Sequence, residues 1–211
     1  MRTLMVLLAL GVGANATATP VWSQGAGSAV ETVDAAATFD TVQNRDSLAY
    51  FQEDGISVNV SDVAFVSFDP TGGLGGFDDG FFYANGGTPD PYVVDVGGAD
   101  LLAVEFTVGS GFVVDRLVGY TRLYYETFRD GVSTGVGSVR FALGEVFGLR
   151  DVFGFDTLHV YNANPFQGGK NALALDDLRV ERVAVDEPMS LLLFVLGLLM
   201  VSTLVRPQYL R

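Results

Sequence analysis

Between residues 35 and 185 the chain consists of short runs rich in β-branched and aromatic residues, separated by clusters of glycine, aspartate, asparagine and proline. Such runs are typical of β-strands, and the clusters are typical of the turns between them. No sustained helical period occurs before the C-terminal tail, so the sequence predicts an all-β domain. Many short strands favour a jelly-roll-like β-sandwich, because two packed sheets protect most strand edges.

The expected strands cover residues 36–42, 56–60, 63–68, 92–96, 101–108, 112–128, 139–146, 153–162 and 172–185. Residues 68–91 form the longest expected loop, and loops of this length usually have a function or lack regular structure.

The first 18 residues have the features of a secretory signal peptide. Arg2 precedes a short apolar run, and small residues follow at Ala14, Ala16 and Ala18. The run is too short to span a membrane, and the alanines form cleavage patterns of the A-x-A type. Ala26 is also a small residue, so the sequence does not fix the position at which the signal peptide is cleaved. Residues 19–34 are expected to form a flexible lead-in to a β-sandwich domain at 35–185.

The other end of the chain, residues 186–211, contains a second apolar segment. Residues 189–205 carry no charge, and their length is at the lower limit for a transmembrane helix. Arg206 and Arg211 follow, so the positive-inside rule places this end in the cytoplasm and the domain outside. The sequence therefore predicts an exported protein of the cell envelope or extracellular surface, anchored transiently or permanently by this helix.

The chain has 25 acidic and 12 basic residues and a net charge of −13. Such a charge excludes nucleic acid and disfavours anionic surfaces in general, whereas neutral glycans, cations and basic surfaces stay open as partners. The chain has no cysteine, so disulfide bonds cannot stabilise the domain.

The tail resembles the PEP-CTERM sorting signal of exported proteins in Gram-negative bacteria. The matching residues are Glu187 and Pro188, the apolar segment, and Arg206, whereas Asp186 stands where that signal has its first proline. The resemblance implies processing by a membrane exosortase. A plain single-pass anchor is the alternative.

Residues 172–180, Ala-Leu-Ala-Leu-Asp-Asp-Leu-Arg-Val, resemble the closing strand of the β-sandwich domains in such proteins, which are similar to carbohydrate-binding jelly rolls. This resemblance implies one structural Ca²⁺, held by Asp177 and Asp40, with Asp176 as an alternative ligand. The other interpretation is that the aspartate pair bonds backbone amides or nearby arginines, without a metal.

Two tyrosines mark a candidate binding surface. Tyr120 and Tyr124 share one face of their strand by parity, and aromatic rings on a sheet face can stack on sugars. Packing in the core is the alternative. The single histidine, His159, excludes a His/Cys metal site within one chain and is expected to be an ordinary strand residue.

The sequence favours a non-enzymatic protein associated with the cell envelope or an extracellular polysaccharide, delivered by a PEP-CTERM route. A carbohydrate-binding jelly-roll module is the first alternative. A hydrolase acting on polysaccharide is the second, and it would need two converging carboxylates among Glu105, Glu126 and Glu145.

Overall fold

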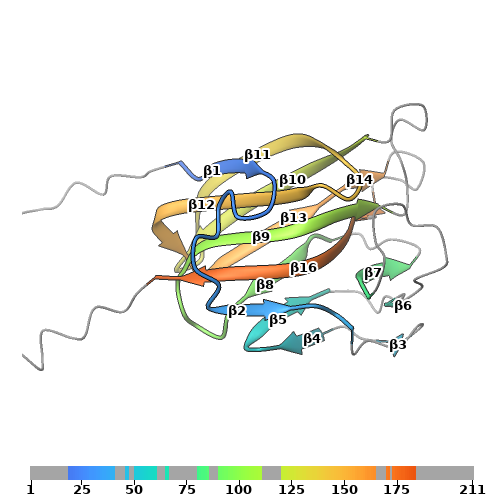
Figure 1. Cartoon of the computed structure of the whole chain (residues 1–211), viewed down its shortest axis with the longest axis horizontal. Coiled ribbons are helices and arrows are strands. Elements are labelled where there is room, and N and C mark those ends of the chain that lie inside the picture. The colour runs from blue at the N-terminus through green and yellow to red at the C-terminus, as the bar shows by residue number, and fades with distance from the viewer. Residues whose placement is uncertain are drawn as a thin grey trace, which may run out of the picture.

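In a computed structural model, the described residues are 19–40, 46–47, 50–60, 65–66, 80–85, 90–110, 120–164, 170–171 and 173–183. Every regular secondary-structure element within these residues is a β-strand, and most of these strands belong to two antiparallel sheets. The expected all-β sandwich is therefore confirmed (Figure 1).

The first sheet has eight strands in the order β1-β12-β9-β16-β7-β6-β3, and β2 also pairs with β16. Their bounds are β1 Val21–Gln24, β2 Ala35–Ala37, β3 Asp46–Ser47, β6 Phe65–Val66, β7 Phe82–Asn85, β9 Leu101–Ser110, β12 Val146–Phe155 and β16 Leu173–Arg182.

The second sheet has six strands in the order β11-β10-β13-β8-β5-β4. Their bounds are β4 Tyr50–Glu53, β5 Ile56–Asn59, β8 Tyr92–Asp95, β10 Tyr120–Arg129, β11 Val132–Ala142 and β13 Thr157–Tyr161. A separate short pair joins β14 Ala163–Asn164 to β15 Lys170–Asn171.

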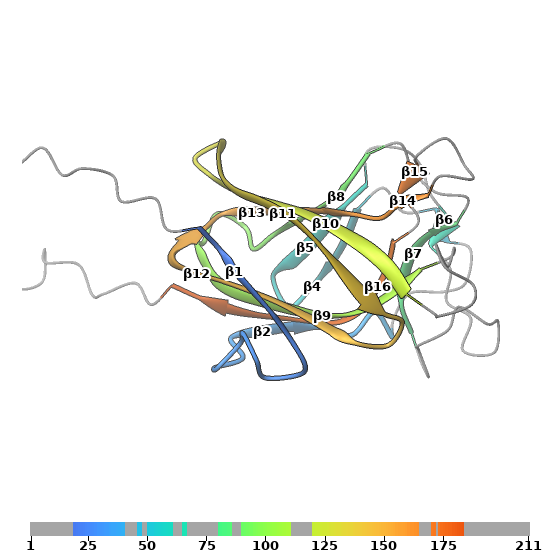
Figure 2. The same ribbon diagram turned by 90° about the horizontal axis from the view of Figure 1, so that it is seen from above.

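The chain passes from one sheet to the other along its second half. Strand β9 lies in the eight-stranded sheet, β10 and β11 in the six-stranded sheet, β12 in the first again, β13 in the second and β16 in the first. Figure 2 shows the resulting two layers, with β10, β13 and β8 in one and β12, β9 and β2 in the other. The first and last described strands, β1 and β16, begin and end at the same end of the sandwich (Figures 1 and 2).

Alternate residues of both sheets point inward and form one core. In β10, Leu123 and Tyr125 are buried, whereas Arg122 is exposed and Tyr124 half-buried, as strand periodicity requires. The core is rich in aromatic rings; a group at one end consists of Phe39, Phe51, Phe82 and Tyr92. The buried hydroxyl of Tyr92 donates a 2.7 Å hydrogen bond to the carbonyl of Leu173 and so links the two sheets.

The structure differs from the sequence expectation at residues 19–34, which were expected to form a flexible lead-in. Strand β1 pairs with β12, and Trp22 contacts Phe141 of β11 with ring centroids 6.2 Å apart. A side chain at Gly135 of β11 would overlap the Pro20 ring. The segment thus covers the gap between the edge strands of the two sheets, and the ordered domain begins before residue 35.

Candidate functional site

The outer face of the six-stranded sheet carries a group of exposed and half-buried aromatic and charged side chains. We call it the tyrosine face; it consists of Arg122, Tyr124, Glu126 and Phe128 of β10, Val136, Ser138 and Arg140 of β11, and His159 and Tyr161 of β13. Strand parity places these residues on one face: Arg122, Tyr124 and Glu126 are each opposite other members in the register of β10, and Phe128 follows two residues after Glu126.

Tyr124 and Tyr161 are the centre of this face. They are directly opposite each other on β10 and β13, and their rings stack with centroids 4.8 Å apart and planes 11° apart. Tyr161 is 37% exposed and Tyr124 is half-buried, so neither ring belongs to the core. On the other side of Tyr124 the register places Ser138, which is exposed.

Tyr124 is half-buried on the outer face of the sheet, whereas Tyr125, its neighbour in sequence, is buried in the core. Binding of a sugar by Tyr120 and Tyr124 stays a prediction. Tyr120 is the first residue of β10, but its side chain lies outside the described part of the structure. The sequence reasoning missed Tyr161, because only the register of β10 with β13 shows that it is adjacent to Tyr124.

Next to the tyrosine pair, Phe128 and His159 form a second aromatic contact, with ring centroids 4.5 Å apart. Burial lowers the pKa of His159 below its ordinary value of 6.5, and the nearby charge of Glu126 offsets this only in part. His159 is therefore neutral at pH 7 and serves this face as an uncharged ring.

The aspartates that the resemblance implied as calcium ligands lie around a β-bulge in β16. The register with β9 shifts between Asp176 and Arg179, so that β16 has one more residue than its partner there. Asp177 has a φ of 49°, and its amide donates a 2.7 Å hydrogen bond to Oδ1 of Asp176. The Asp-Asp pair therefore forms the bulge itself.

These aspartates have different surroundings. Asp176 is buried, Asp177 is exposed with Oδ1 3.8 Å from Nη2 of Arg179, and Asp40 is exposed beyond the end of β2. Calcium requires six to eight oxygen ligands. Among the residues that the structure describes, no group of three or more acidic or histidine side chains could hold a metal ion. A calcium site at Asp177, Asp40 or Asp176 therefore stays a prediction from the resemblance.

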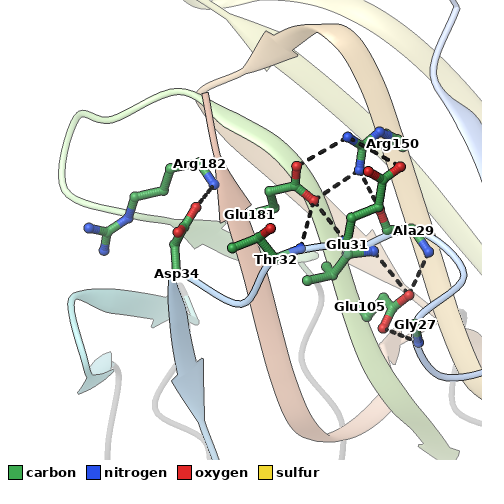
Figure 3. Close-up of polar contacts among 10 residues, drawn as sticks. Gly27, Ala29, Glu31, Thr32, Asp34, Glu105, Arg150, Glu181 and Arg182 are labelled. Carbon is green, nitrogen blue, oxygen red and sulfur yellow. Dashed lines mark hydrogen bonds and ion pairs between the residues drawn. The ribbon is translucent and has the colours of Figure 1, made fainter. Parts of the chain in front are cut away.

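A second polar cluster lies on the outer face of the eight-stranded sheet, where residues 25–34 cross β12, β9 and β16 (Figure 3). We call this segment the strap. Arg150, Ala103 and Glu181 are opposite one another on the three strands. Because Ala103 is small, Arg150 reaches across it to Glu181 with two hydrogen bonds of 2.9 and 3.1 Å.

These side chains hold the backbone of the strap. Nη1 of Arg150 donates to the carbonyl of Ala29 at 2.6 Å, and Oε2 of Glu181 accepts from the amides of Glu31 and Thr32. Burial alone would raise the pKa of Glu181, but the hydrogen bonds from Arg150 and the two amides outweigh it and hold that pKa below 4.5.

Glu105 is the most deeply buried acid of this cluster, with only 2% of its surface exposed. Its carboxylate accepts three backbone amides, from Gly27 at 2.9 Å, Ala29 at 2.6 Å and Val30 at 3.1 Å. A buried carboxylate is stable only when such donors replace its water. Glu105 thus anchors the strap and is covered by it.

The carboxylates that a hydrolase would need are not brought together. Glu105 lies under the strap, Glu126 is on the outer face of the other sheet, and Glu145 accepts the amide of Ala142 in the turn after β11. A surface depression of about 470 Å³ is lined by Thr32, Asp34, Glu181, Arg182 and Val183. Its carboxylates are already engaged, because Asp34 accepts the amide of Arg182 and Glu181 holds the strap.

The sorting residues Glu187, Pro188 and Arg206, the apolar segment 189–205 and the signal peptide lie outside the described residues. In the part of the chain that the structure describes, no helix has the length and apolar character needed to cross a membrane.

Comparison with known proteins adds little to this geometry. No family model and no curated protein matches the chain. One solved structure, the C-terminal domain of a chitobiase from Bacteroides fragilis, is similar at 13% identity and a TM-score of 0.27, over 65% of this chain and 99% of that one. A match this distant carries no functional argument. The fold and the described surfaces define the chain as an all-β sandwich protein.

Proposed function

We propose that this chain is an exported, non-enzymatic protein of the cell envelope whose tyrosine face binds a polysaccharide. The observation that carries the proposal is the stacked pair of Tyr124 and Tyr161 on an outer sheet face. Aromatic side chains that lie outside the core present apolar ring surface, and the apolar faces of sugar rings complement it.

Further features of the same face support glycan binding. Phe128 and the neutral ring of His159 extend the aromatic surface along the strands. Glu126 and Ser138 supply hydrogen-bonding groups beside the rings. A few polar groups placed around aromatic surface are the usual composition of a small-ligand site.

The test is binding to a panel of soluble polysaccharides by affinity electrophoresis and calorimetry, with wild type and the double variant Tyr124→Ala/Tyr161→Ala. Each aromatic ring contributes about 0.5–1.5 kcal/mol, so the double variant loses about 1–3 kcal/mol and should bind about 5- to 150-fold more weakly. Tyr50→Ala is the matched control, because Tyr50 is an exposed tyrosine on β4 at the other edge of the same sheet. Equal affinity of the double variant and wild type would refute the proposal.

The jelly-roll-type connectivity and the route to the cell surface are part of the same proposal. The signal peptide exports the chain, and the exosortase processes the tail that begins with Glu187 and Pro188. Mass spectrometry of the native protein tests this route. Loss of the residues after Pro188 is the expected result, whereas an intact tail in the membrane fraction would favour a plain anchor.

The position of β1 favours signal cleavage before Val21 over cleavage after Ala26. Cleavage after Ala26 would remove β1, which pairs with β12 and covers Phe141. We therefore propose that the mature chain begins before Val21, and N-terminal sequencing of the native protein tests this directly.

A further inference from the structure

A bulge in β12 exposes two apolar side chains that are adjacent in sequence. Val152 is 70% exposed and Phe153 is 48% exposed. In a regular strand of a sandwich, adjacent side chains point to opposite faces, so one of the two would lie in the core. Here residues 151–154 of β12 correspond to a single residue of β9, Leu102, and the register resumes at Phe155.

The contacts around this bulge hold it in shape. Asp151 is buried, and its Oδ1 accepts a 2.9 Å hydrogen bond from the amide of Phe153. Gly154 is buried with a φ of 75°, and a Cβ at this position would lie 2.7 Å from Cγ2 of Val183. The bulge is therefore packed against the C-terminal end of the domain, and its two exposed side chains are fixed outward.

Two more exposed valines lie close to the bulge. Val21, the first residue of β1, is 68% exposed and directly opposite Arg150. Val132, the first residue of β11, is 66% exposed, and the turn before it is bonded to the residue after β12, because Asp130 donates its amide to Asp156. Strands β1 and β11 begin at the end of the sandwich where β12 and β16 end (Figures 1 and 2). We call this surface the apolar end; it consists of Val21, Val132, Val152 and Phe153.

The chain also leaves the domain at the apolar end. Val183, the last described residue, donates its amide to the carbonyl of Asp100 at 2.9 Å and contacts the bulge. The apolar segment 189–205 begins six residues after Val183. Six residues reach at most about 20 Å, so a segment that spans a membrane keeps the apolar end within about 20 Å of the bilayer.

Resting on the proposed export route, in which segment 189–205 anchors the chain transiently or permanently, we propose that the apolar end docks on the lipid surface. Val152 and Phe153 insert among the headgroups, where apolar side chains leave water. The short link favours lipid as the occupant, because it holds the bilayer next to the apolar end at high effective concentration. The strands then lead away from the membrane, and the tyrosine face stays accessible to a polysaccharide.

The charge of the apolar end selects the kind of lipid. Asp100 and Asp130 are both exposed there, whereas the arginines nearby, Arg150 and Arg182, are half-buried. Exposed carboxylates are repelled by an anionic membrane surface. The partner is therefore a bilayer of zwitterionic lipid.

The test uses single-cysteine variants, because the chain has no cysteine of its own. Val152→Cys and Val136→Cys each carry an environment-sensitive fluorophore, and the mature chain with its tail is reconstituted into phosphatidylcholine vesicles that contain a nitroxide-labelled lipid. Val136 is the matched control, because it is a valine of similar exposure, 74%, on the tyrosine face. The label at 152 should emit at shorter wavelength and be quenched by the lipid, whereas the label at 136 should behave as in water.

Two changes should weaken docking. Phe153→Ser in the Val152→Cys chain should lower the ratio of docked to undocked protein about three- to tenfold, because a partly exposed phenylalanine no longer leaves water. Replacing part of the phosphatidylcholine by phosphatidylglycerol should also reduce quenching. Quenching that neither change reduces would contradict the proposal.

Vesicle flotation separates failure of docking from failure of the anchor. A chain that floats with the vesicles while its label at 152 stays unquenched would overturn this inference and leave the anchor intact. Equal quenching at 136 and 152 would also overturn it, as would a wavelength shift at 152 without quenching, which indicates contact with a second copy. A chain that does not float would overturn both the anchor and the docking. Polysaccharide binding by the tyrosine face is measured separately and is independent of each of these results.

Discussion

Replacing Glu105 with glutamine tests whether the strap is an integral part of the domain. The carboxylate of Glu105 accepts three amides of the strap while being 2% exposed. Glutamine keeps one acceptor oxygen for Ala29 and Val30, but its NH₂ group faces the amide of Gly27. One hydrogen bond to a charged group is lost, and two become bonds to a neutral group.

The lost bond is worth about 1.5–3 kcal/mol, and weakening the other two adds about 1 kcal/mol, so the total loss is about 3 kcal/mol. Domains of about 150–250 residues lose about 2–4 °C in Tm for each kcal/mol, so Glu105→Gln should lower Tm by about 6–12 °C. Differential scanning calorimetry measures this change. The fluorescence of Trp22 in β1, the single tryptophan of the chain, reports whether the N-terminal segment detaches first.

Glu31→Gln is the control for the change in charge. Glu31 lies in the strap, but its side chain is 75% exposed and its Oε1 is 3.7 Å from Nη2 of Arg150. An exposed ion pair of this kind stabilises a fold by less than about 1 kcal/mol. The Tm of Glu31→Gln should stay within about 3 °C of wild type. A similar Tm for Glu105→Gln and Glu31→Gln would refute the account of the strap.

Three other predictions concern the strap and the closing strand. The pKa of Glu181 is held below 4.5 in the folded state, so its stabilising contribution is present above about pH 4.5 and is lost as pH falls through the folded pKa. The Tm difference between wild type and Glu181→Gln should therefore shrink from pH 6 to pH 3, and a constant difference would contradict this assignment. Gly148→Ala should cost about 1–3 kcal/mol, because its Cβ would lie 2.5 Å from Oγ of Ser23 and 2.8 Å from Cβ of Ala29. An unchanged melting curve for Gly148→Ala would show that the strap does not approach β12 this closely. The resemblance of the closing strand predicts that Ca²⁺ raises Tm and that a chelator lowers it, and elemental analysis without calcium together with an unchanged Tm would remove the metal site.

The sequence allowed the fold class to be predicted, because strand periodicity and turn residues are local properties. It missed the hairpin between β10 and β11, since separate strands were expected at 112–128 and 139–146. The turn is Asp130-Gly131, with φ values of 51° and 72°. An Asp-Gly pair between two apolar runs is a strong hairpin pattern, so residues 132–138 could have been assigned from the sequence.

The strap could not be predicted in this way. Ala103 and Glu105 alternate with core residues of β9, so parity places them on an outward face. They are nevertheless buried, because a segment about 75 residues earlier in the chain covers them. Contacts between distant segments leave no periodic pattern, and the charged Glu105 resembles a solvent-exposed residue in sequence.

The tyrosine face was predicted in part. Parity placed Tyr124 and Tyr120 on the same face of one strand, and the structure shows Tyr124 half-buried on the outer face of the sheet. The adjacency of Tyr161 and of Arg140 depends on the register of β10 with β13 and with β11, which the sequence of a single strand does not contain.

The most direct test of the central claim is to locate the bound polysaccharide on the domain by nuclear magnetic resonance. The ¹⁵N-labelled protein is titrated with an oligosaccharide of the polymer that binds best, and shifted amide signals are mapped onto the strands. The account predicts that the largest changes occur in β10, β11 and β13, around Tyr124 and Tyr161. Changes concentrated in the strap and β16, with none in these three strands, would contradict it.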